Sequence, residues 1–149
     1  MVVMRRLPFW CLIALFSVSG GVIAGDDPVT FYVQLLRGTN EEKTEDIKVK
    51  EVGPKLRKKL SPVFRWKNYW EVSRTAVTVG KGKAGRVQLP NAHALEIELL
   101  NPAESEVRLY LNGALRRKSR QPIHNRMTIM GGDNNDDCWF VVVRRDPPQ

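Results

Sequence analysis

The sequence predicts an α+β domain: a mostly antiparallel β-sheet or small β-sandwich of about seven strands, with one short amphipathic helix after the first strand. Three observations support this fold class. Short runs of branched and aromatic residues alternate apolar and polar positions, as half-buried strands do. Clusters of glycine, proline and asparagine separate these runs. One segment instead repeats apolar residues every four positions, as an amphipathic helix does.

The first predicted strand spans residues 30–36, because Phe31, Val33 and Leu35 would share one face of it. The charged segment 40–46 follows this strand. It has no apolar side chain to bury, so we expect a solvated loop there.

The predicted helix spans residues 54–60. Pro54 suits the first helical position, because the donor that proline lacks would be unpaired there anyway. Leu56, Leu60 and Phe64 repeat every four residues and would form one buried stripe, with lysine and arginine on the other sides. Pro62 should end or kink the helix near Leu60 and Ser61, since proline removes a hydrogen-bond donor and clashes with the preceding turn.

The remaining predicted strands are residues 68–79, 86–89, 94–100, 106–111, 114–121 and 138–143, and residues 126–130 lead into the loop that precedes the last of them. Asn112 and Gly113 form the strongest hairpin signal, because a type I′ turn needs a positive φ at both central residues. Residues 131–137 should form a polar loop. The run 138–143 is apolar on both faces, which predicts an interior strand or one covered by both the sheet and the helix.

The N-terminus is typical of a bacterial export signal. Arg5 and Arg6 precede the uncharged run 7–18, and Ala24 is a small residue at which a signal peptidase could cut. We therefore expect an exported protein, periplasmic or extracellular and open to association with the envelope. The alternative is an uncleaved membrane anchor over residues 7–25, whose length is close to that of a spanning helix.

We expect two parts, a signal peptide over residues 1–24 and a single small strand-rich domain over residues 25–149, which ends in a frayed tail at 146–149. The whole chain has 24 basic and 16 acidic residues and a net charge of +8. Cleavage would remove two basic residues and no acidic ones, which leaves +6. It would also remove Cys11. Cys138 would then be the only cysteine, so packing and not an intramolecular disulfide would stabilise the domain.

Asp133, Asn135 and Asp137 have the one-three-five spacing of the oxygen ligands in a calcium-binding loop. The rest of that pattern is missing. Cys138 stands where the loop needs a glycine, and Arg144 stands where it needs a glutamate. A hairpin of turn-forming residues is the better interpretation, so we predict no metal site and no cofactor.

No catalytic residue is predicted either. Cys138 could form an activated nucleophile with His93 or His124. However, Cys138 adjoins an apolar strand, where cysteine is usually a small buried hydrophobe, and both histidines have ordinary surface settings. Glu96 and Glu98 would lie on the outward face of one strand, and a solvated strand face explains them better than acid–base catalysis does.

Basic clusters are the most suggestive feature of the sequence. The candidate binding surface consists of Lys55, Arg57, Lys58, Lys59, Arg65, Trp66, Lys67, Arg116, Arg117, Lys118 and Arg120. These residues could form one positive surface for a polyanion if the helix and the strand 114–121 are neighbours. Trp66 could stack on a sugar or a base, but aromatic side chains at a helix–strand junction are more often part of a core. Basic residues on an exposed strand also discourage edge pairing, which is a simpler explanation for them.

Residues 53–70, with the sequence GPKLRKKLSPVFRWKNYW, resemble a passage from a helix into an aromatic-rich strand in a family of small, uncharacterised exported bacterial proteins. The resemblance covers under a fifth of the chain. It implies a signal peptide followed by a small domain. It assigns no activity and no functional residue.

The sequence favours an exported, non-enzymatic binding protein of the periplasm or cell envelope, which would use a sheet edge and its basic surface to bind a protein or an anionic envelope component. Two alternatives stay open. One is an enzyme acting on an anionic envelope substrate, with Cys138 or a carboxylate pair in its site. The other is a module that binds polyanions directly. The sequence has no motif specific for nucleic acid, and a membrane tether is expected only if the signal is uncleaved.

Overall fold

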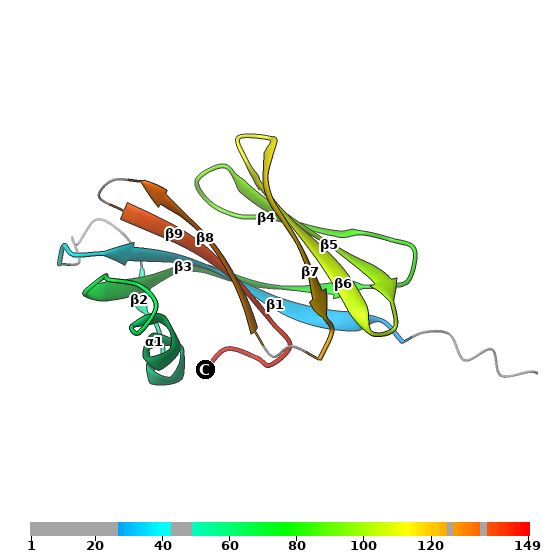
Figure 1. Ribbon diagram of the computed structural model, residues 1–149, viewed down its shortest axis with the longest axis horizontal. Coiled ribbons are helices and arrows are strands. Elements are labelled where there is room, and N and C mark those ends of the chain that lie inside the picture. Colours follow the sequence, from blue (N-terminus) through cyan, green and yellow to red (C-terminus); the bar gives the residue numbers. More distant parts are fainter. Residues whose placement is uncertain (1–26, 43–48, 125–126, 135–136) are drawn as a thin grey trace, which may run out of the picture.

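The computed structural model of the protein describes residues 27–42, 49–124, 127–134 and 137–149, which hold nine strands and one helix (Figure 1). The predicted signal peptide and most of the predicted charged loop lie outside the described residues. Within the described ranges, no helix is long and apolar enough to cross a membrane.

The strands form two antiparallel sheets, so the predicted small β-sandwich with one short helix is confirmed. Sheet A has the order β2 (Lys50–Glu51), β3 (Asn68–Val79), β1 (Val29–Thr39), β9 (Asp137–Arg144), β8 (Met127–Asn134). Sheet B has the order β4 (Gly85–Gln88), β5 (His93–Asn101), β6 (Glu104–Leu111), β7 (Ala114–Pro122). After β3 the chain crosses to sheet B, where β4 to β7 are neighbours in chain order. After β7 it returns to sheet A and forms β8 and β9. Strand β9 also pairs with β1.

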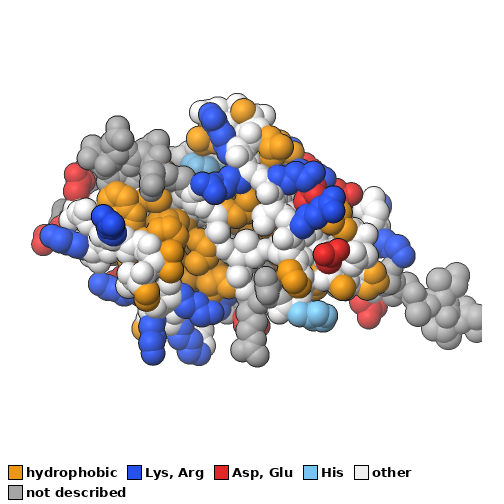
Figure 2. All heavy atoms as spheres, in the orientation of Figure 1, with side chains coloured by type: hydrophobic (Ala, Val, Ile, Leu, Met, Phe, Trp, Pro, Cys, Tyr) orange, Lys and Arg blue, Asp and Glu red, His pale blue; other side chains and the backbone are white. Residues whose placement is uncertain are grey.

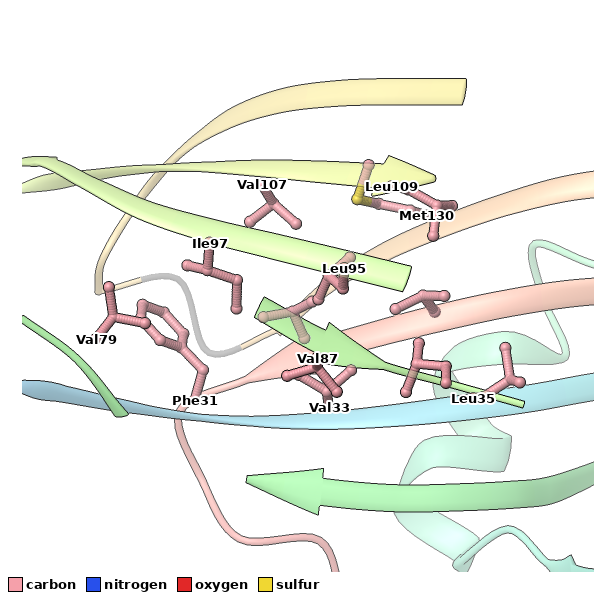
Figure 3. Packing of buried hydrophobic residues seen from close by; sticks show 13 residues of the cluster. Phe31, Val33, Leu35, Val79, Val87, Leu95, Ile97, Val107, Leu109 and Met130 are labelled. Atoms are coloured by element: carbon pink, nitrogen blue, oxygen red, sulfur yellow. The ribbon is translucent and has the colours of Figure 1, made fainter. Parts of the chain in front are cut away.

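The main core lies between the two sheets (Figure 3). Phe31, Val33 and Leu35 of β1 are buried there, on the single face that their alternation predicted. They pack in one cluster with Leu95 and Ile97 of β5. Burial of such side chains is the dominant favourable term in folding, at about 25 cal/mol per Å² of apolar surface.

A second core lies on the outer face of sheet A, beneath α1 (Pro54–Leu60). Leu56 and Leu60 are buried there together with Phe140 of β9. The central strands β1 and β9 are therefore covered on both faces, by sheet B on one side and by α1 on the other. This explains why residues 139–143 are apolar at every position, and the predicted interior strand is confirmed.

Two tight turns place residues other than glycine in the left-handed backbone region. Asn112 has a φ of 51° and Gly113 a φ of 77°, which confirms the predicted positive φ at both positions between β6 and β7. Asn91 and Ala92 both have a φ of 58° between β4 and β5. The Ala92 carbonyl oxygen accepts a hydrogen bond from the backbone N–H of Asn112 at 2.9 Å, so the two hairpin ends are joined.

The structure departs from the predicted elements in three places. Strand β2 has only two exposed residues, too few for an alternation to show. Strands β8 and β9 extend to Asn134 and Asp137, so the segment predicted as a polar loop is mostly strand. The C-terminal tail is not frayed, because the Arg74 guanidinium donates to the carbonyl oxygens of Pro148 at 3.0 Å and Gln149 at 3.2 Å.

Candidate interaction surfaces

The predicted binding residues fall into two groups, which the fold places on different layers. The helical group lies on α1 and the segment after it, over the outer face of sheet A: Lys55, Arg57, Lys58, Lys59, Arg65, Trp66 and Lys67. The strand group lies on β7, an edge strand of sheet B: Arg116, Arg117, Lys118 and Arg120. Figure 2 shows lysine and arginine side chains gathered at the α1 end of the molecule and again over sheet B, with hydrophobic and uncharged surface between. The fold therefore presents two basic surfaces and not one.

Apolar side chains from the same segment pack beneath the cations of the helical group. Leu56 and Leu60 are buried, and Phe64 extends the same stripe onto Phe140, with ring centroids 4.3 Å apart. The backbone N–H of Phe64 still donates to the Leu60 carbonyl oxygen at 2.9 Å, so a helical turn continues past Pro62 although α1 ends at Leu60 as predicted. The lysines of α1 take no part in this packing and are exposed.

Arg57 attaches α1 to the sheet. Its Nη1 pairs with the Glu51 carboxylate of β2 at 2.6 Å, and its Nη2 donates to the Lys67 carbonyl oxygen at 3.3 Å. Because both side chains of the ion pair are about half exposed, the pair contributes only about 0.2–1 kcal/mol to stability. Arg57 is therefore less available to an external anion than the lysines beside it.

Trp66 packs on the sheet. A Cβ atom placed on Gly38 would lie 2.6 Å from Trp66 Cδ1 and 2.9 Å from Phe140 Cε2, so the indole lies directly on the backbone of β1. Tyr69 is buried in the same cluster and donates its hydroxyl to the Phe64 carbonyl oxygen at 3.0 Å; burial raises the pKa of this hydroxyl. Of the two interpretations of Trp66, these contacts favour a part of the core.

The strand group lies on a strand that pairs on one side only within the described part of the chain. Strand β7 pairs with β6, and after Pro122 the chain crosses to β8 in the other sheet. Residues 114–118 are all exposed, and Leu115 is 51% exposed among them. The register between β6 and β7 shifts so that Arg116 is a bulged residue with no partner position on β6.

Two members of the strand group contact a buried carboxylate. Glu106 on β6 is 1% exposed and lies 2.5 Å from Arg108 Nη2, 3.1 Å from Lys118 Nζ and 3.3 Å from Arg120 Nε. Burial alone would raise the pKa of Glu106, but hydrogen bonds from Lys118, Arg108 and Arg120 outweigh burial and hold this pKa below its ordinary value. Sequence reasoning missed Glu106. It holds an outward position on β6 and is buried only because long cations from neighbouring strand positions cover it.

Arg108 extends this network across sheet B. Its guanidinium contacts Glu96 at 2.7 Å and Glu98 at 2.8 Å on β5, and Glu96 also lies 3.4 Å from Arg86 on β4. Hydrogen bonds to Glu96, and then to Glu98 and the buried carboxylate of β6, raise the pKa of Arg108. Glu96 and Glu98 thus lie on the outward face, as predicted, where Arg108 neutralises them.

The other predicted cations form no ion pair with the residues that the structure describes: Lys55, Lys58, Lys59, Arg65, Lys67, Arg116 and Arg117. These are the positions at which an external anion would meet uncompensated charge.

Cys138 and His93 lie on opposite sides of sheet A. Cys138 is 1% exposed in the cluster beneath α1, which confirms the predicted buried cysteine. The next residue, Trp139, points to the other side, where its ring lies 5.8 Å from that of His93. The predicted surface setting of His93 is wrong: its Nδ1 lies 3.2 Å from the Pro90 carbonyl oxygen, and the turn holds the ring in a buried position. His124 is exposed, as predicted.

The candidate calcium loop of Asp133, Asn135 and Asp137 lies outside the described side chains. Elsewhere, in the ranges that the structure does describe, no group of three or more histidine, cysteine, aspartate or glutamate side chains is placed to hold a metal ion.

A small hollow of about 180 Å³ opens at the end of the sandwich where β1 begins. Its apolar walls include Val29, Leu99, Leu100, Pro102 and Ile123. They come from three separate parts of the chain, so no local sequence pattern could have indicated them. A catalytic pocket usually combines apolar walls with several convergent polar groups, and these walls are mainly apolar.

Comparisons of the chain with protein families, with curated proteins and with solved structures found no match.

Proposed function

We propose that the chain is an exported, non-enzymatic interaction protein of the periplasm or cell envelope, which binds an extended acidic segment of a protein partner along β7. The observation that supports this proposal is the exposed edge of β7, where Arg116 and Arg117 form no ion pair with any described residue. An extended segment can add to a sheet edge through main-chain hydrogen bonds, and side chains beside the edge then select the partner.

Charge argues against a second copy of the chain as this partner. Two β7 strands side by side would bring their arginines together, and like charges opposite each other destabilise a strand pair. The bulge at Arg116 restricts pairing further, so an added strand would follow residues 117–121. An acidic segment there would meet Arg116 and Arg117 as attractive charges.

The enzymatic alternative has no comparable support. Cys138 is buried beneath α1, and Glu96 and Glu98 are neutralised by Arg108. A catalytic acid, base or nucleophile has to reach its substrate within hydrogen-bond distance. Cys138 is too deeply buried to do so, and the two glutamates are held in ion pairs with Arg108 on an outward strand face.

A photo-crosslinking amino acid at Leu115 tests the proposed surface in the cells that make the protein. We expect it to capture a protein partner. The same probe at Gln88, which is exposed on the opposite edge strand β4, should not capture that partner. The charge reversal R116E/R117E should abolish capture from Leu115. Equal capture from both positions, or capture that survives charge reversal, would contradict the proposal.

Export is a separate part of the proposal and rests on the N-terminal signal pattern. Mass spectrometry of protein recovered from the envelope or the medium should find a chain that begins at Gly25, after cleavage at Ala24. An envelope-bound chain that keeps residues 1–24 would identify a tethered protein. Retention in the cytoplasm would rule out export.

A further inference from the structure

We infer that the helical group is a docking surface for an anionic lipid bilayer. This docking surface is separate from β7, and its partner is a lipid bilayer where the proposed partner of β7 is a protein. The inference therefore goes beyond the proposed function. Three features of the surface support it: uncompensated charge, an exposed apolar side chain among the cations, and a rigid mounting.

The cations of this surface are exposed and close together in the chain. Lys55, Lys58 and Lys59 lie on α1, and Arg65 follows in the next turn. None of them forms an ion pair with a residue that the structure describes. Glu51, the acidic residue of β2 beside α1, is already ion-paired. Clusters of exposed cations such as this are attracted to bilayers that contain anionic lipid, over a range of about one Debye length.

Val63 favours a bilayer over a soluble polyanion. Its side chain is 70% exposed, and its backbone N–H donates to the Leu60 carbonyl oxygen at 3.0 Å in the turn that continues α1. It follows Lys55 and Lys59 at four-residue spacing, which places the three along one side of the helical segment. An apolar side chain flanked by cations can enter the headgroup region of a bilayer. A soluble polyanion has no hydrocarbon interior for this side chain to enter.

The surface is preorganised by the packing beneath it. Leu56, Leu60 and Phe64 fix α1 on sheet A, so its cations and Val63 can meet a membrane without first ordering the backbone. Figure 1 shows α1 on the outer face of sheet A, away from sheet B. A bilayer at α1 would therefore leave β7 accessible to a partner.

Attraction of this kind is reversible and depends on salt. Each cation close to an anionic bilayer is expected to raise binding about fivefold, and salt screens this effect. The contact expected is that of a peripheral protein and not of an inserted one.

Sedimentation of the full chain with lipid vesicles tests the inference. Phosphatidylcholine vesicles measure any contribution of the apolar N-terminal segment, and vesicles that also contain phosphatidylglycerol measure the added effect of anionic lipid. We expect binding to rise with phosphatidylglycerol and to fall as salt is raised. K58Q/K59Q should lower the partition coefficient about 25-fold, because each lost cation costs about fivefold. No increase with phosphatidylglycerol would overturn the inference.

R116Q/R117Q is the matched control, because it removes the same charge from β7. It should change vesicle binding by less than about twofold, since β7 lies on the other layer. V63S should weaken vesicle binding and leave retention on heparin unchanged. Equal losses in the two double variants would show a net-charge effect and overturn the inference. Heparin retention that depends on Lys58 and Lys59, with no effect of V63S on vesicles, would identify a soluble polyanion and overturn it as well. Neither result would change the capture of a protein partner by a photo-crosslinker at Leu115. The experiments can therefore contradict this inference without contradicting the proposed function, and the reverse.

Discussion

The helical group and the strand group are both basic, but the protein holds them in place by different means. Beneath the helical group, Leu56 and Leu60 pack against sheet A, and the lysines of α1 do not contribute to that packing. Within the strand group, Lys118 and Arg120 themselves contact the buried Glu106 carboxylate. Basic residues that look alike in the sequence thus have different roles: the lysines of α1 form no ion pair with a described residue, whereas Lys118 and Arg120 are part of an ion-pair network. Apolar packing is insensitive to pH, whereas ion pairs depend on it, so different perturbations should act on the two regions.

The largest difference should appear when one leucine is truncated in each region. L60A should lower the free energy of unfolding by about 2–5 kcal/mol, because Leu60 is fully buried and its loss leaves a cavity. L115A, on the exposed part of β7, should change this free energy by less than about 0.5 kcal/mol. Urea unfolding measures both. Similar losses would show that β7 depends on apolar packing as much as α1 does.

The close packing of Trp66 predicts the next effect. G38A should lower stability by about 1–3 kcal/mol, because the added Cβ would overlap the Trp66 indole and the Phe140 ring. G80A is the matched control, since a Cβ there would meet nothing within 4 Å. Thermal unfolding of the two variants should separate them clearly. If they lost equal stability, Trp66 would not be packed on β1 as the structure has it.

Acid should act on the strand group through Glu106. The pKa of Glu106 is lowered in the folded protein, so its carboxylate stabilises the fold fully above its unfolded pKa, near 4.5, and this stabilisation is lost as the pH falls through the lower folded pKa. E106Q should therefore flatten the fall in melting temperature below about pH 4.5. E42Q, at an exposed glutamate, should not. An unchanged acid profile in E106Q would mean that this ion-pair centre does not stabilise β7.

A smaller effect on stability is expected in the turn between β4 and β5, whose Ala92 carbonyl oxygen accepts a hydrogen bond from the turn between β6 and β7. A92G should raise stability by about 0.5–1 kcal/mol, because glycine adopts the φ of 58° without the steric cost that alanine bears. A94G, two residues further on in β5, should instead lower stability, because Ala94 is buried in a strand. Melting temperatures measure both signs. A loss of stability in A92G would show that the left-handed turn is not strained.

The smallest effect is expected from the exposed ion pair of the helical group. R57Q should lower stability by only about 0.2–1 kcal/mol, and the cost should shrink at high salt, because Arg57 and Glu51 are both half exposed. Chemical denaturation at low and high salt measures this change. A larger cost that salt does not alter would mean that Arg57 supports α1 mainly through the Lys67 carbonyl and its own packing.

Most of the secondary structure could be predicted because its signals are local. The bounds of α1 agree with the prediction, since the four-residue repeat, Pro54 at the first helical position and Pro62 just past the end all lie within one short segment. Gly131 misled the prediction of β8, because glycine usually indicates a turn. Here a Cβ at this position would lie 2.8 Å from Phe140 Cδ1, so the glycine makes room for a ring within the sheet.

The candidate site could be predicted only in part. The sequence identified the cations, but which of them are ion-paired depends on the register of β6 and β7, which places Arg120 opposite Glu106 and Lys118 opposite Arg108. It also left open whether Trp66 faces solvent, because the backbone it covers lies almost thirty residues earlier in the chain, at Gly38.

The sequence alone thus determined most of the strands, the helix, the hairpin turn and the presence of two basic segments, because periodicity and turn chemistry act between residues close in the chain. Only the tertiary structure decided that the two segments lie on different layers, that Glu106 and His93 are buried, and that β7 is an edge. Burial and ion pairing depend on residues brought together from distant parts of the chain, and a local sequence pattern does not indicate which distant residues will be in contact.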